Sequence, residues 1–286
     1  MTPKNPWKHV KVDPARLENN RFLNPIVPPE PDPQPDPTPT PRRSSTLSGK
    51  YILMAQTSTY GLGVDALVKA CQAESNSAHP QFPKDDGSLI YRPLTFRETI
   101  QARVDDFNIE QDDDGNDRDI EDRLRFFNKW LDSCTGIGYK AKTKKFKLAS
   151  ECSQLIEITS DFADAFLPTL YNQIQGVELD SGKRGVKYGE LLTETEVNGH
   201  EAWINAVGDD QEGKDLLREY TGIVFSQLKR KYDQEYGMCF WVVQNPAKDQ
   251  LRALYVSSLY NYSIAYGDSN LDSVGSFLRV AQERTP

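Results

Sequence analysis

The sequence is poor in the residue types that usually carry out catalysis or hold metal ions. It contains three histidines and four cysteines among 286 residues, and the cysteines are far apart with no CxxC pair. Zinc sites are normally built from closely spaced Cys and His ligands, so the sequence gives no support for one. The dispersed cysteines are instead expected to be reduced and mostly buried.

Histidine chemistry would depend on His200. His9 lies in a polar N-terminal segment and His79 in a polar loop before a proline, which leaves His200 for any Ser/His/Asp or Cys/His machinery. His200 comes directly before a short helix that we predict over residues 201–207, so a helix-start or surface position accounts for it. We therefore expect a protein that is not an enzyme.

Long apolar runs are absent as well. No segment approaches the roughly 20 apolar residues of a transmembrane helix, and residues 1–20 carry lysines but no apolar stretch that would indicate a signal peptide. We expect synthesis in the cytoplasm, with a virion as a candidate final location. The net charge of −8 disfavours binding to phosphate backbones, so nucleic acid is not an expected partner.

One glycine motif has the local context of a nucleotide site. Gly61, Gly63 and Ala66 match G-x-G-x-x-A between a predicted strand over 51–56 and a predicted helix over 61–71. A dinucleotide fold then needs a second strand that ends in an acidic residue, but residues 76–87 form a polar loop. The Gly61–Gly63 match therefore supports only an alternative hypothesis, in which this turn binds a ligand.

Proline, by contrast, is concentrated in one place. Eight of the fourteen residues in 28–41 are proline, which predicts polyproline II or irregular coil. Residues 1–49 are therefore expected to form an extended arm, and residues 50–286 a single globular domain with a candidate sub-boundary near 176–190. A disordered tail is the alternative to an arm that docks on a neighbour. The apolar anchors of such an interaction arm are Trp7, Phe22, Leu23, Ile26 and Val27.

Apolar spacing in the rest of the chain predicts more helix than strand. A capping box, Thr95 to Glu98, begins a helix through about residue 108, and a second helix over 118–134 would bury Leu124 and Phe127. Residues 249–266 are ambiguous, because their spacing fits a helix but their tyrosines and β-branched residues favour strands. The fold class expected is α+β and helix-dominant, with the Pro-rich arm. Further helices are predicted over 161–175, 211–233 and 271–283, and strands over 139–148, 154–158 and 238–244.

The segment 110–121 carries the strongest chemical pattern. Its carboxylates alternate before a glycine and a distal glutamate, as in D-x-D-x-D-G-x5-E, and this spacing resembles the calcium loop of the EF-hand family. Two positions depart from that family: Glu110 stands where Asp is expected, and Asp117 where an apolar residue is expected. A solvated acidic loop and an acidic docking surface are the alternatives. Calcium is the only cofactor that the sequence suggests. Its candidate ligands are Glu110, Asp112, Asp114 and Glu121.

Two runs of opposite charge lie close together in the sequence. Residues 105–122 hold ten carboxylates and one arginine, a net −9, and residues 140–147 hold five lysines and no acid. One helix of about 17 residues would separate them by roughly 25 Å. In a head-to-tail ring, the acidic run of one subunit could meet the basic run of the next. The residues proposed for these charge patches are Asp112, Asp113 and Asp114 on one side and Lys140, Lys142, Lys144 and Lys145 on the other.

Together these features favour a non-enzymatic structural subunit of a large homo-oligomeric assembly. By analogy with proteins that lace neighbours with extended arms, we expect a phage virion component of the capsid, neck or connector, or tail. Its partners would be copies of itself and other assembly proteins. The alternative is an intracellular enzyme or ligand-binding protein that uses the Gly61–Gly63 turn or a calcium-binding acidic loop.

Overall fold

The computed structural model describes residues 51–53, 89–112, 114–149, 170–269 and 276–283. The predicted arm with its five anchors, the Gly61–Gly63 turn, the helix over 61–71 and the strand over 154–158 lie outside these residues. So does Asp113, and most of the helix predicted over 161–175. Within the described helices, none is long and apolar enough to cross a membrane.

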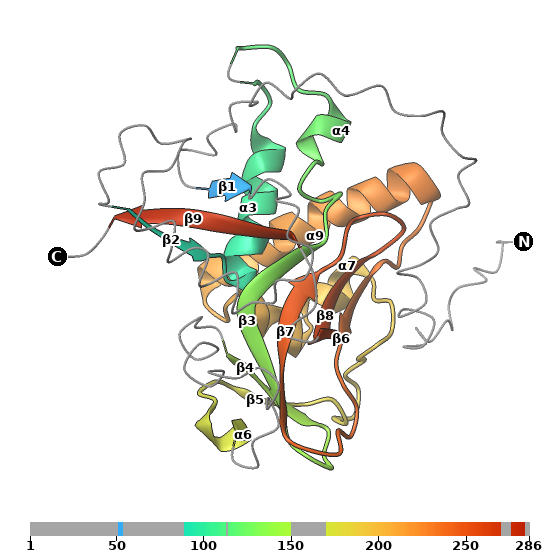
Figure 1. The fold of residues 1–286 in the computed structure, drawn as a ribbon. Helices are drawn as coiled ribbons and strands as arrows, with labels where there is room; N and C mark the ends of the chain where they lie inside the picture. Colours follow the sequence, from blue (N-terminus) through green and yellow to red (C-terminus); the bar gives the residue numbers. More distant parts are fainter. Residues whose placement is uncertain (1–50, 54–88, 113, 150–169, 270–275, 284–286) are drawn as a thin grey trace, which may run out of the picture.

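A curled mixed sheet organises the described residues (Figure 1). Its main path runs β1-β9-β3-β7-β8-β6, while β2 also pairs with β9, and β4 joins β3 to β5. Pairings are antiparallel except between β3 and β9 and between β6 and β8. The strands are β1 (Tyr51–Leu53), β2 (Leu89–Pro93), β3 (Leu131–Tyr139), β4 (Lys145–Ala149), β5 (Glu178–Asp180), β6 (Met238–Trp241), β7 (Gln250–Val256), β8 (Ser263–Ser269) and β9 (Ser276–Glu283).

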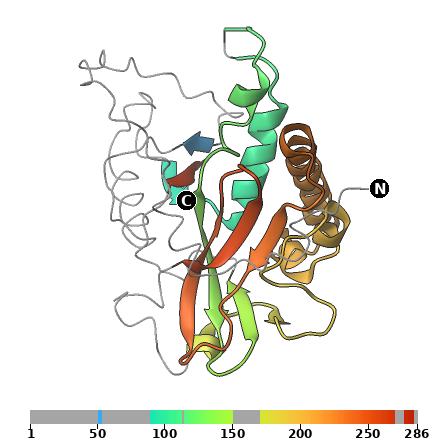
Figure 2. The same ribbon diagram turned by 90° about the vertical axis from the view of Figure 1, so that its right-hand side faces the viewer.

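The longer helices pack on one face of this sheet (Figure 2). The capping box predicted at Thr95 and Glu98 is present and begins α3, and the helix predicted over 211–233 is confirmed as α9 with Asp210 as its N-cap. Gly208, at φ +107°, lets the chain turn from α8 into α9. The helices are α3 (Phe96–Asn108), α4 (Ile120–Arg123), α6 (Leu170–Gln173), α7 (Glu194–Asn198), α8 (Glu201–Val207) and α9 (Gln211–Tyr232).

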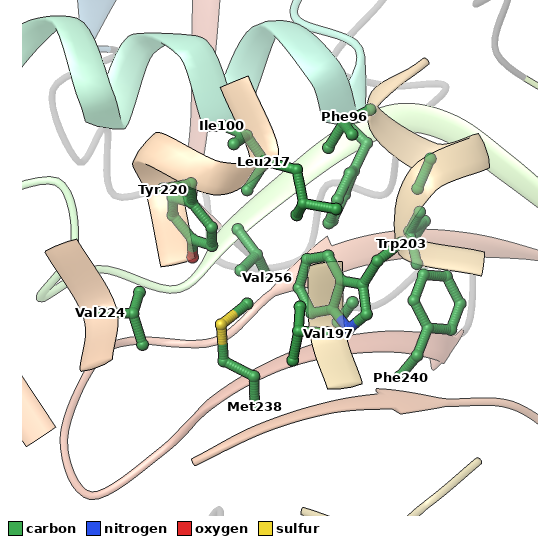
Figure 3. Packing of buried hydrophobic residues seen from close by; sticks show 14 of the residues in the cluster. Phe96, Ile100, Val197, Trp203, Leu217, Tyr220, Val224, Met238, Phe240 and Val256 are labelled. Atoms are coloured by element: carbon green, nitrogen blue, oxygen red, sulfur yellow. The ribbon is translucent and has the colours of Figure 1, made fainter. Parts of the chain in front are cut away.

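The core lies between these helices and the sheet (Figure 3). Trp203 of α8 is fully buried at its centre, with the rings of Phe96 and Phe240 centred 5.9 and 5.7 Å away. Phe127 stacks on Tyr220 of α9 at 5.4 Å. Because these rings come from α3, α8, α9, β6 and the segment before β3, one aromatic cluster joins both layers.

The expectation of a helix-dominant α+β fold is wrong, and the largest error concerns residues 118–134. Only α4 is helical there, and the chain then enters β3. All nine residues of β3 are buried, so this strand has no polar alternation to reveal it. Its glycines matter for packing, because a Cβ on Gly138 would lie 1.9 Å from Cδ1 of Ile174. Sheet pairing on both sides therefore prevails over the local helical spacing.

Two other segments are strands where helix was predicted or left open. The ambiguous residues 249–266 form β7 and most of β8, and the helix predicted over 271–283 is replaced by β9. The strand predicted over 139–148 is confirmed only over 145–148 in β4, because β3 ends at Tyr139 and Lys142, at φ +55°, lies in the turn between the two strands. The strand predicted over 238–244 is confirmed as the shorter β6.

Replacing Phe127 by alanine should destabilise the fold strongly. Its side chain is fully buried between Tyr220 and Phe107, so the substitution would leave a cavity that rigid neighbours cannot fill. We expect a loss of about 3–5 kcal/mol in the free energy of unfolding, measured by urea denaturation. The neighbouring exposed residue gives the control: Asn128→Ala should change it by less than about 0.5 kcal/mol. Equal effects of the two variants would contradict the packing described.

Candidate functional site

Exposed aromatic side chains gather at the end of the sheet where β3 begins and β7 ends. The register pairs Leu131 with Val256, so the residue before β3 lies beside the loop that follows β7. Trp130 is 45% exposed, and Tyr260 in the β7–β8 loop is 71% exposed. We call the following set the aromatic surface: Trp130, Tyr232, Tyr255, Tyr260, Tyr262 and Tyr266.

Five of the six rings form two groups, and Tyr262 packs against the cluster that contains Tyr266. In the first, Tyr266 is stacked on both Trp130 and Tyr255, with ring centres 5.9 and 4.9 Å apart. Tyr266 itself is buried and forms the floor of this stack. In the second, Tyr260 lies 6.1 Å from Tyr232 at the end of α9. The stacked contacts limit ring motion, so the first group offers a stiff apolar face with polar edges.

A buried arginine fixes the two chain segments that carry these rings. Nη2 of Arg103 donates hydrogen bonds to the carbonyl oxygens of Lys129, at 2.6 Å, and Ser257, at 2.9 Å. Its Nη1 donates a hydrogen bond to the hydroxyl of Tyr220 at 2.8 Å. This hydroxyl in turn lies 2.9 Å from Oγ of Ser263. Arg103 therefore joins the residue before Trp130 to both ends of the loop that holds Tyr260.

Burial lowers the pKa of Arg103, because its charged form is removed from water. The hydrogen bonds given above go to neutral oxygens, and the ring of Phe127 lies 5.6 Å from its guanidinium carbon. A second link is the backbone N–H of Leu259, which donates to the carbonyl of Phe127 at 2.6 Å. The loop is thus attached at several points along its length, and its exposed side chains start from a fixed backbone.

The predicted calcium ligands do not come together. The carboxylate of Asp112 accepts hydrogen bonds from the backbone N–H groups of Asn116, at 2.8 Å, and Asp114, at 3.0 Å, and these bonds lower its pKa. Glu121 contacts Lys231 of α9 at 2.7 Å instead. Across the described ranges, no group of three or more His, Cys, Asp or Glu side chains is arranged to hold a metal.

The segment that resembled an EF-hand loop is a tight hairpin. Gln111 and Asp117 form an isolated antiparallel bridge, and Gly115 adopts φ +80° at the turn between them. We call the described residues 110–112 and 114–119 the acidic hairpin. The carboxylate of Asp112 accepts bonds within the turn, and that of Asp119 caps α4, so the described carboxylates do not point towards a common centre.

We therefore expect calcium to bind the acidic hairpin weakly, because its carboxylates would have to leave their present hydrogen bonds to converge. Titration calorimetry on the full chain should give a dissociation constant no tighter than about 1 mM, the range of loose extracellular sites. Asp112→Asn, which keeps the side-chain shape, should leave the weak signal nearly unchanged. Micromolar binding that Asp112→Asn abolishes would restore the EF-hand interpretation.

The lysines of the predicted basic patch lie at the opposite end of the sheet. Lys140, Lys142 and Lys144 lie in the turn between β3 and β4. Lys145 begins β4, where it pairs with Glu178 at 2.6 Å. The separation from the acidic run is set by strand β3 rather than by a helix. Nine residues at about 3.3 Å each span about 30 Å.

His200 lies in the core rather than on the surface. It precedes α8 as predicted, but its side chain makes no capping bond, and the residue is only 5% exposed. Its Nε2 lies 3.0 Å from the carbonyl oxygen of Lys187, to which it donates, and its ring packs against Tyr188 and Phe240. Burial lowers the pKa of His200, which keeps the ring neutral.

This histidine makes stability depend on pH. In the unfolded chain its pKa is near 6.5, and in the folded chain it is lower, so below about pH 6.5 the unfolded state binds the extra proton. The contribution of the neutral, buried His200 to the free energy of unfolding is therefore complete above about pH 6.5, and it is lost as the pH falls below that value. We expect His200→Gln to remove up to about 1.4 kcal/mol per pH unit of the decline between about pH 6.5 and 5, measured by urea denaturation. Parallel pH profiles of the two proteins would contradict this.

Comparisons with known proteins do not identify a family. No family profile matches the chain, and no curated protein is similar to it. One similar solved structure is described as "Accommodation of massive sequence variation in Nanoarchaeota by the C-type lectin fold". It shares 13% identity with this chain at a TM-score of 0.44, and the match covers 78% of this chain and 94% of that one. A likeness of this degree assigns neither fold nor function.

Proposed function

We propose that the protein is a non-enzymatic binding subunit of a larger assembly, and that it holds a protein partner with the aromatic surface. The observation that carries this proposal is the exposure of Trp130 and Tyr260 on segments that Arg103 holds in place. Single exposed apolar residues are ordinary on soluble proteins, but clustered aromatic side chains mark interaction sites.

The composition of the β7–β8 loop supports a protein as the partner. Residues 257–262 read Ser-Ser-Leu-Tyr-Asn-Tyr. Tyrosine supplies large contact area at low entropic cost, and serine and asparagine supply adaptable hydrogen bonds, which is the mixture found in antibody binding loops. Tryptophan and tyrosine are also the residues that most often dominate the binding energy of protein interfaces.

The fixed backbone beneath the loop supports the same proposal. A loop that must be ordered on binding loses affinity for that reason, whereas one already attached at Ser257, Leu259 and Ser263 loses less. Membership of a phage virion, and a lacing role for the arm anchors, stay predictions from the sequence.

The test compares two baits made from the full chain, the natural protein and a Trp130→Ser/Tyr260→Ser variant. Proteins captured by the first should be purified and titrated against both by calorimetry. We expect the double variant to weaken binding at least about 30-fold, since interface aromatics commonly contribute about 2 kcal/mol or more. Urea denaturation of both baits checks that the exposed substitutions leave the fold intact.

A matched control removes an exposed apolar side chain elsewhere. Val177, beside β5, is 53% exposed and lies outside the aromatic surface, so Val177→Ser should retain full affinity. A purified partner that binds the double variant and the natural protein equally would refute the proposed site.

A further inference from the structure

Three loops are held together at the end of the sheet opposite the acidic hairpin. The backbone N–H of Ser181 donates to the carbonyl of Lys144 at 2.9 Å, and that of Lys142 donates to the carbonyl of Pro246 at 2.7 Å. The hydroxyl of Ser181 also lies 3.1 Å from Oε1 of Gln244. The turn between β3 and β4, the loop after β5 and the loop between β6 and β7 therefore form one surface.

The carboxylates at this end are already engaged. Glu178 accepts hydrogen bonds from Lys145, at 2.6 Å, and from the hydroxyl of Tyr171, at 2.8 Å. Asp180 accepts from the backbone N–H of Gly182, and Asp249 from that of Ala141. Bonds from neutral N–H groups leave the charges of Asp180 and Asp249 in place, but the cations outnumber the anions: residues 140–145, 178–184 and 242–249 hold seven Lys and Arg and three Asp and Glu.

Several exposed cations at this end form no direct ion pair in the described part of the chain. Lys183 and Lys187 pair with Glu201 and Glu196. Within the part of the chain that the structure describes, no ion pair involves the other exposed cations of the first two loops. We call this set the basic end: Lys140, Lys142, Lys144 and Arg184.

These loops therefore keep a net positive charge on a protein whose overall net charge is −8. Repulsion among their cations is relieved only when an anionic group approaches, so the surface favours an acidic partner. The same chain carries such a group in the acidic hairpin, whose described carboxylates are exposed. The two surfaces lie at opposite ends of the sheet (Figure 1), about 30 Å or more apart, so one molecule cannot bring them together.

The acidic hairpin is also fixed in place. The buried carboxylate of Asp106 in α3 lies 3.2 Å from Nη2 of Arg118 and 2.5 Å from Nη2 of Arg125. Arg118 additionally donates to the carbonyl oxygens of Asp106 and Ile109. A hairpin held in this way presents its charges in one arrangement and loses little entropy on binding.

From these observations we propose that the basic end of one copy binds the acidic hairpin of the next, in a head-to-tail contact. Because the two surfaces differ, a pair of copies retains one unoccupied acidic hairpin and one unoccupied basic end, and the contact repeats until a ring closes or a filament grows. This contact uses other residues than the aromatic surface, which lies at the end of the sheet where β3 begins and β7 ends.

Light scattering on the full chain tests the contact. At about 50 mM salt the mass should rise with concentration, and at about 500 mM it should fall towards the monomer, because salt screens exposed charges. Lys142→Glu/Lys144→Glu/Arg184→Glu should weaken association at least tenfold. The control Lys214→Glu/Arg218→Glu/Lys229→Glu makes the same change in net charge on α9 and should associate like the natural protein.

A charge exchange identifies the partner surface. Glu110→Lys/Asp114→Lys/Asp117→Lys should also be monomeric alone, since both its ends are then positive. Mixing it with the Lys142/Lys144/Arg184 variant should restore association, because each reversed surface then meets its complement. Trp130→Ser/Tyr260→Ser should associate normally, which separates this contact from the proposed partner site.

Three results would overturn the proposal. The first is a natural protein that stays monomeric at about 50 mM salt and a chain concentration of about 100 µM. A specific contact with a dissociation constant below that concentration would be populated there. The second is a mixture of the two reversed variants that stays monomeric. The third is binding of a nucleic acid oligomer that the Lys142/Lys144/Arg184 variant loses, since this would assign the basic end to phosphate groups.

Discussion

The guanidinium of Arg103 holds together the parts of the fold on which the exposed surfaces depend. It extends from α3, donates to the hydroxyl of Tyr220, lies near the ring of Phe127, and reaches the carbonyl oxygens of Lys129 and Ser257. Burying a charge costs several kcal/mol, and the hydrogen bonds of Nη1 and Nη2 offset part of this cost, although the buried Nε has no partner among the described residues. The backbone oxygens that Arg103 engages belong to segments that have no regular structure of their own, so they gain a fixed position from this contact.

Helix α3 thus serves two surfaces through neighbouring turns. Arg103 orders the segments with Trp130 and Tyr260, and Asp106, one turn later, binds Arg118 and orders the acidic hairpin. The capping box and the stack of α3 on α8 and α9 hold the helix itself. A buried charge of each sign on adjacent turns of a helix also limits the net charge that the core must accommodate.

Local signals in the sequence were sufficient for α3 and α9 but not for the sheet. Thr95 and Glu98 specify a helix start through their own hydrogen bonds, and the 22 residues of α9 repeat one apolar face. Strand β3 carries no such signal, because all its residues are buried and only β4 is a near neighbour in the sequence, whereas β7 and β9 come from distant segments. The spacing of Leu124, Phe127 and Leu131 matched a helix because a short helix, a turn and a strand happen to place them all inward.

The candidate surfaces were predictable to unequal degrees. Clusters of like charge are visible in any sequence, so the acidic hairpin and the lysines near Lys142 were found, although their separation depends on β3. The aromatic surface was missed, because the tyrosines of 255–266 were weighed only as a choice between helix and strand. Their mixture with serine and asparagine was the signal that could have revealed it.

Strand β9 has a consequence for how the chain is made. It pairs with β1 and β2, which come early in the chain, and with β3. None of these pairings can form until the ribosome has synthesised β9, so during translation the early strands keep unpaired backbone edges. Such edges readily pair with other chains, and contacts between distant segments form slowly. The period between the synthesis of β3 and that of β9 is therefore when a nascent chain is most exposed to aggregation and most in need of a chaperone.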